Sequence, residues 1–138
     1  MAATTNQLIK AQQPDGLIAV PVIASTNFPQ GTMAFAVAAS GHASNVIASG
    51  ANAFLGVVKE QCDNSSGAAA AKKVELYTQG VFEFQGTGFT QALVGDKIYA
   101  IDNFAVDGTS TNQTLIGRCT EFISSTRIMV QIEVGTQA

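Results

Sequence analysis

A strict alternation of apolar and polar residues over residues 127–134 constrains the fold of this chain more than any other feature. A β-strand places successive side chains on opposite faces, whereas helical spacing would scatter the same residues around a cylinder. The segment therefore predicts a strand with one buried and one solvent-exposed face. The buried face carries Ile128, Val130, Ile132 and Val134, and the exposed face carries Arg127, Met129, Gln131 and Glu133.

The same period of two begins over residues 74–78 and resumes after Gly80, with Phe82 and Phe84 on one face. A lone glycine inside a strand pattern predicts a bulge or a bend at that point. Further strands are predicted at residues 17–23, 33–38, 54–59, 97–101 and 115–122.

Turn chemistry separates these strands. Gly and Asx residues mark turns at residues 29–31, 86–88, 95–96 and 107–108, and those around Gly86 and Gly95 are predicted to be hairpin turns. Pro21 removes a main-chain donor, so the first strand is expected to be at a sheet edge or broken there. Short strands at this spacing predict an all-β sandwich or barrel.

One stretch favours helix. Residues 66–73 contain four consecutive alanines followed by two lysines, a composition that suits a helix end. The stretch is too short to be stable without tertiary contacts, so we expect a loop with at most one short helical turn.

The 138 residues fit one domain. Residues 1–16 are polar, end in the turn signal Pro14-Asp15-Gly16, and offer only Leu8 and Ile9 as apolar anchors. We therefore divide the chain into an N-terminal arm, residues 1–16, and a single β domain, residues 17–138. Such a terminus is most often simply unstructured, and the alternative is an arm that adds a strand to the sheet edge of a partner.

Charge is sparse. Only 12% of the residues are charged, against about 25% in an average soluble domain. Either the side chains of Ser, Thr, Asn and Gln make up the polar part of the solvent-exposed surface, or partner proteins cover much of that surface. The net charge of −3 argues against a basic surface that could bind the phosphate backbone of a nucleic acid. We expect no membrane-spanning segment and no signal peptide, because no run approaches 20 apolar residues and the first residues lack a basic and an apolar region.

Catalytic and metal-binding patterns are not evident in the sequence. Cys62 and Cys119 have no ligand spacing around them, so we interpret them as reduced apolar residues, with one disulfide left open. A triad could be assembled from Ser44, His42 and Asp63, but no nucleophile elbow supports it. We therefore expect no enzymatic activity, no metal and no cofactor.

The order of motifs from residue 45 onward is distinctive. A segment ending in Gly56-Val57-Val58 is followed by one containing Gly80-Val81-Phe82, then by residues 94–102 with Gly-Asp-Lys-Ile-Tyr, residues 115–119 with Ile-Gly, and the closing strand 128–134. This ordered set, over about two thirds of the chain, resembles the capsid cement (head decoration) proteins of tailed bacteriophages.

The resemblance implies a small β-sandwich or β-tulip domain on the outer surface of the virion capsid. It implies a homotrimer at capsomer junctions, with the major capsid protein as partner and no catalytic residue to carry over. We expect the arm and the first strand to face the capsid, with Leu8 and Ile9 as anchors. The candidate capsid-binding residues are Thr4, Thr5, Gln7, Leu8, Ile9 and Lys10. The alternative is the base of a head fibre or an adhesive glycan-binding module, a role that favours exposed aromatic residues in a concave surface.

Overall fold

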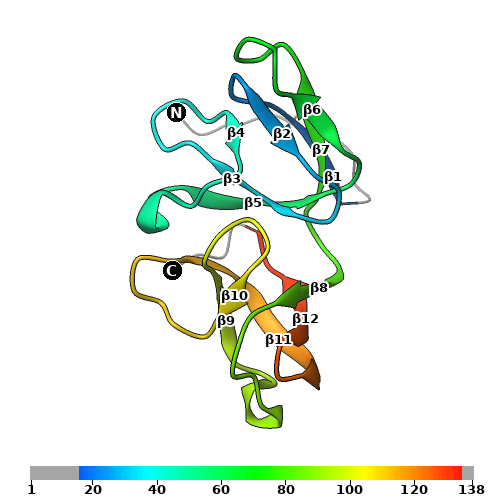
Figure 1. The fold of residues 1–138 in the computed structure, drawn as a ribbon, viewed down its shortest axis with the longest axis vertical. Coiled ribbons are helices and arrows are strands. Elements are labelled where there is room, and N and C mark those ends of the chain that lie inside the picture. The colour runs from blue at the N-terminus through cyan, green and yellow to red at the C-terminus, as the bar shows by residue number, and fades with distance from the viewer. Residues whose placement is uncertain (1–15, 135–138) are drawn as a thin grey trace, which may run out of the picture.

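The computed structural model describes residues 16–134, which form three antiparallel sheets with almost no helix (Figure 1). The prediction of an all-β fold is confirmed. The strands are β1 (Leu17–Pro21), β2 (Thr26–Phe28), β3 (Met33–Ala36), β4 (Ala43–Ser44), β5 (Ala53–Val58), β6 (Cys62–Asn64), β7 (Lys73–Tyr77), β8 (Val81–Gln85), β9 (Lys97–Ala100), β10 (Val106–Asp107), β11 (Thr114–Ser124) and β12 (Arg127–Ile132). Two 3₁₀ turns, η1 (Ala48–Gly50) and η2 (Gln91–Leu93), complete the described part.

The strands divide into two units along the chain (Figure 1). The first unit, residues 16–78, contains a five-stranded sheet with the order β1-β7-β5-β3-β4 and the small sheet β2-β6. The second unit, residues 80–134, contains a five-stranded sheet with the order β10-β9-β11-β12-β8. The chain passes between them at residues 78–80, where Gly80 has a φ of 127°, so the predicted bend at this glycine is confirmed.

The two five-stranded sheets have the same topology. Replacing β1, β3, β4, β5 and β7 by β8, β9, β10, β11 and β12 converts the strand order of the first unit into that of the second. The pairing register is also shared: Leu17 pairs with Tyr77 as Val81 pairs with Gln131, and the next four pairs of each ladder follow in step. The unit is thus repeated within the chain, with β2 and β6 present only in the first copy.

Turns and bulges repeat as well. Thr78 N–H donates to Gly16 O at 2.7 Å, and Ile132 N–H donates to Gly80 O at 3.0 Å. The N–H of Gly31 donates to Val58 O at 2.9 Å, as the N–H of Gly95 donates to Cys119 O at 2.8 Å. Matching loops are therefore held by matching hydrogen bonds.

A bulge with a central glycine lies in each unit. The register between β3 and β5 shifts beside Gly56, and the register between β9 and β11 shifts beside Gly117. A Cβ on Gly56 would lie 2.3 Å from Tyr77 O, and one on Gly117 would lie 2.0 Å from Gln131 O. Only glycine allows the backbone to approach its neighbouring strand this closely.

One core joins the units. Four apolar side chains project from the first sheet toward the second unit and pack in one cluster with the buried residues of that unit. They belong to Met33, Phe35, Phe54 and Val57. The opposite side of the first sheet packs with Phe28 in a second cluster. Hydrogen bonds add to the junction: Met33 N–H donates to Asn103 O at 2.7 Å, and Thr114 Oγ1 donates to Asn52 O at 3.0 Å. The central strands β3 and β5 contribute buried apolar residues to both clusters, so these two strands are apolar on both sides.

All eight strands predicted from the sequence are present, and residues 66–73 form turns and bends without a helix before β7 begins at Lys73. The hairpin turns predicted around Gly86 and Gly95 are wrong. β8 pairs with β12, and β9 pairs with β10 and β11, so both glycines belong to a connection between strands that are not neighbours. The short strands β2, β4, β6 and β10 lacked enough alternation to be predicted.

Candidate interaction surface

The outer edge of β1 is an open strand edge. β1 is the last strand of its sheet and pairs with β7 alone. Gly16 and Val22 form hydrogen bonds with the β7 side, at 2.7 Å to Thr78 and 3.1 Å to Lys72. In an antiparallel ladder alternate residues point their main-chain groups to opposite sides, so Leu17, Ala19 and Pro21 direct theirs away from the sheet.

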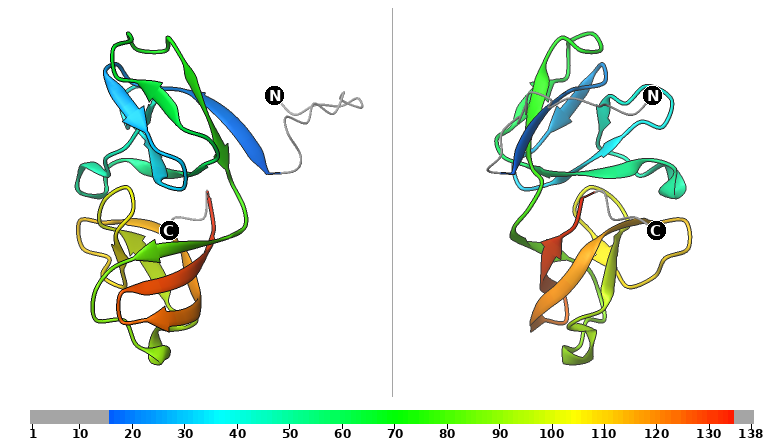
Figure 2. Two further views of the ribbon diagram at one scale, coloured as in Figure 1. Left: turned by 45° about the vertical axis from the view of Figure 1, so that its right-hand side comes forward. Right: turned by 180° about the vertical axis from the view of Figure 1, so that it is seen from behind.

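The composition of this edge is unusual. β1 contains no charged residue, and all five of its residues are partly exposed. Natural sheets commonly protect such edges with charges, proline or a covering element. Pro21 protects one end, in agreement with the prediction that it lies on an edge strand. Beyond it the chain is covered, because Ile23 N–H donates to Ala43 O at 3.0 Å. The open stretch is therefore residues 17–21, which stand out from the first unit in Figure 2.

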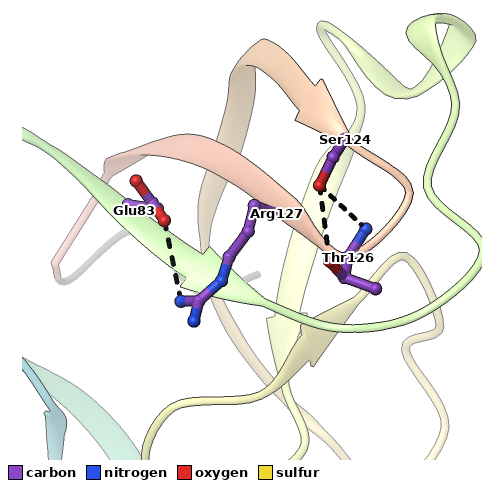
Figure 3. Close-up of polar contacts among 4 residues, drawn as sticks. All are labelled: Glu83, Ser124, Thr126 and Arg127. Atoms are coloured by element: carbon purple, nitrogen blue, oxygen red, sulfur yellow. Dashed lines mark hydrogen bonds and ion pairs between the residues drawn. The ribbon is translucent and has the colours of Figure 1, made fainter.

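The equivalent strand of the second unit, β8, is also an edge strand, but it is protected differently. Glu83 Oε2 forms an ion pair with Arg127 Nη1 at 3.6 Å, and this pair lies across β8 and β12 (Figure 3). The Arg127 guanidinium also lies over the Phe104 ring, 5.4 Å from its centre. Gln85 N–H donates to Phe104 O at 3.5 Å, so the outward main-chain groups that stay open belong to Val81 and Glu83.

Two open hollows lie elsewhere on the surface. One, of about 360 Å³, is lined by residues in and next to β6 and β7 with charges of both signs, among them Asp63, Lys72 and Glu75. The other, of about 280 Å³, lies between η1 and the start of β11 and holds a single aromatic side chain, Tyr99. Neither contains the group of aromatic residues that an adhesive glycan site would favour.

The residues considered for a catalytic triad belong to local turns and strands. His42 lies in the turn between β3 and β4. Ser44 is buried, and its Oγ accepts a hydrogen bond from Val46 N–H at 3.2 Å. Asp63 accepts from the hydroxyl of Ser65 at 2.6 Å and from its N–H at 3.0 Å. These hydrogen bonds lower the pKa of Asp63, the hydroxyl contributing most.

Cys62 and Cys119 are free and buried, so the disulfide left open by the sequence is not formed. They lie in different clusters of the core. Burial raises the pKa of both thiols above the ordinary value. Within residues 16–134 no three His, Cys, Asp or Glu side chains gather in a way that could hold a metal ion.

Helices in the described part of the chain are too short and too polar to cross a bilayer. The predicted capsid-binding residues, Thr4, Thr5, Gln7, Leu8, Ile9 and Lys10, lie outside the described residues.

Comparisons of the chain with known protein families, with curated proteins and with solved structures gave no match.

Proposed function

We propose that this chain is a capsid decoration protein of a tailed bacteriophage. It binds the outer surface of the head where capsomers meet and stabilises the shell against the pressure of the packaged DNA. Its partners are the major capsid protein and two further copies of itself. A trimer that straddles a junction makes weak contacts act together, because after the first contact the others are effectively intramolecular.

The observation that carries this proposal is the ordered set of motifs from residue 45 onward. Each motif coincides with a strand or with the turn before it: Gly56-Val57-Val58 ends β5, Gly80 directly precedes β8, and Gly95 precedes β9. The last two correspond to β11 and β12. The motif set therefore follows the framework of the fold rather than isolated loops.

Two features of the surface agree with this role. The open edge of β1 is apolar and uncharged, which suits a chain that works in contact with other proteins. The hollows are open and mostly polar, and the adhesive alternative receives no support from their single aromatic residue.

The direct test uses expanded heads of the phage that encodes the chain, prepared without the decoration protein. The purified chain should sediment with these heads and raise the temperature at which they lose DNA. A variant without residues 1–13 should still fold and form trimers, yet sediment with heads much more weakly. Full binding by that variant would remove the arm from the proposal, and absence of binding by the intact chain would overturn it.

A further inference from the structure

The repetition of the unit gives each chain two equivalent strand edges, β1 and β8, and the two differ in protection. Position 19 of the first unit corresponds to position 83 of the second in the shared register. The second unit has Glu83 there, held by Arg127, whereas the first unit has Ala19. Its equivalent of Arg127 is Lys73, which pairs in register with Pro21.

We propose that β1 of one copy pairs with β8 of the next copy, and that this strand junction closes the homotrimer. This inference takes the number of copies in the ring, three, from the proposed function. A closed ring of three requires two different, complementary surfaces on each copy. The repeated unit supplies one of each kind, an unprotected edge and an acidic one.

The two edges present equal numbers of outward-pointing main-chain N–H and C=O groups. Leu17 and Ala19 direct their N–H and C=O groups away from β7, and Val81 and Glu83 direct theirs away from β12. An antiparallel junction pairs Leu17 with the partner's Glu83 and Ala19 with the partner's Val81, which satisfies four main-chain hydrogen bonds. Each edge also limits the length of the junction. Pro21 of β1 has no N–H to donate, and the N–H of Gln85 in β8 already donates to Phe104 O.

Charge favours this combination over the pairing of like edges. The first unit has three basic and three acidic residues, and the second has three basic and six acidic residues. Two β8 edges brought together would place two acidic units and two copies of Glu83 side by side, whereas β1 is an uncharged strand whose neighbour β7 carries one charge of each sign, Lys73 and Glu75. Complementary potentials select partners and suppress wrong ones. The first strand then faces the neighbouring copy, and contact with the shell is left to the residues before Gly16.

Disulfide trapping tests the junction on the full chain. Cα atoms of a hydrogen-bonded antiparallel pair lie about 5.5 Å apart, a separation that a disulfide spans. Two single variants, Ala19→Cys and Val81→Cys, are prepared, one with an affinity tag so that their masses differ. They are mixed, allowed to exchange subunits, and oxidised with glutathione disulfide. The native thiols are buried, so the unsubstituted chain is the background control.

We expect the mixed disulfide dimer to form at least ten times more than either like dimer. Like dimers of the Ala19→Cys chain would instead indicate pairing of two β1 strands, and like dimers of the Val81→Cys chain would indicate pairing of two β8 strands; both overturn the proposal. Absence of all dimers while light scattering still finds a trimer overturns it too, and leaves the decoration function standing.

A second variant tests the edge without new thiols. Ala19→Glu copies into β1 the residue that protects β8. The new carboxylate lies opposite Glu75 and diagonal to Lys73, so circular dichroism and thermal unfolding first establish that the fold is retained. We expect this variant to be monomeric in light scattering at micromolar concentration, with an unchanged circular dichroism spectrum. Ala71→Glu, in an exposed loop of the same unit, is the matched control and should remain a trimer. A trimeric Ala19→Glu chain would contradict the junction.

Discussion

Replacement of Gly117 by alanine tests whether the close approach inside the bulge determines the fold. The new Cβ would lie 2.0 Å from Gln131 O, a main-chain atom of β12. Ordinary contacts of this kind are about 3.4 Å or longer, so the two strands must separate by more than 1 Å. The ladder between β11 and β12 pairs Arg118 with Gln131 at this point, and its hydrogen bonds would break.

The cost can be estimated from two contributions. A non-glycine residue at the φ of 159° found for Gly117 costs about 1–3 kcal/mol. Loss of two ladder hydrogen bonds costs about 0.5–1.5 kcal/mol each. We therefore expect Gly117→Ala to lower the free energy of unfolding by about 4 kcal/mol. For a chain of this size that is a fall in melting temperature of about 12–20 °C.

Gly95→Ala is the matched control. Gly95 has a φ of 91°, but a Cβ on it would meet nothing within 4 Å. Only backbone strain applies there, about 1–2 kcal/mol, and the smaller entropy of the unfolded alanine chain affects both variants equally. Urea and thermal unfolding, followed by circular dichroism at one fixed protein concentration, measure the difference. Equal stability of the two variants would refute the reasoning. Gly56→Ala should behave like Gly117→Ala, since the two glycines are equivalent.

Further predictions concern the core, the thiols and one surface carboxylate. Phe54→Ala should cost about 3–5 kcal/mol in chemical denaturation, because this buried ring belongs to the core shared by both units. Cys62 and Cys119 should react with a thiol reagent at pH 8 only after unfolding. The pKa values of both thiols are raised in the folded state. The stability that they contribute is therefore complete below pH 9 and is lost as the pH rises through the raised values. Replacing both cysteines by alanine should reduce this loss of stability at alkaline pH. Ser65→Ala should raise the pKa of Asp63, which its hydroxyl lowers, in an NMR titration; an unchanged pKa would contradict this assignment.

Much of the framework was predictable because alternation and turn residues are local signals. The strand at residues 127–134 and the edge position of Pro21 both followed from the chemistry of single segments. The pairing of strands did not follow, since it depends on contacts between residues far apart in the chain. The turns around Gly86 and Gly95 have suitable residues for hairpins, yet each leads to a strand that pairs elsewhere.

The repeated unit was not predicted either, although a signal exists. Residues 16–36 and 80–100 align at a constant separation of 64 residues, with identical residues at four of 21 positions. Gly16 with Gly80 and Gly31 with Gly95 are two of these matches, and both occupy turns with positive φ. The separation falls to 61 residues at Gly56 and Gly117 (117 − 56) because the loops after β3 differ in length, and to 54 residues at Lys73 and Arg127 (127 − 73) because the segment with β6 is present only in the first unit. Glycine positions alone do not identify the repeat, because a separation of 67 residues also matches two pairs, Gly41 with Gly108 and Gly50 with Gly117.

The position of β1 in its sheet has a consequence for synthesis of the chain on the ribosome. β1 pairs only with β7, which begins 52 positions after Pro21 (73 − 21), and β8 pairs within its sheet only with β12, which begins 42 positions after Gln85 (127 − 85). Each sheet therefore closes only when its last strand has been translated, and the first sheet can close while the second is still being made. Until then Met33, Phe35, Phe54 and Val57 have no second unit to cover them. A nascent chain that stalls near Gly80 exposes this apolar face and becomes a target for chaperones.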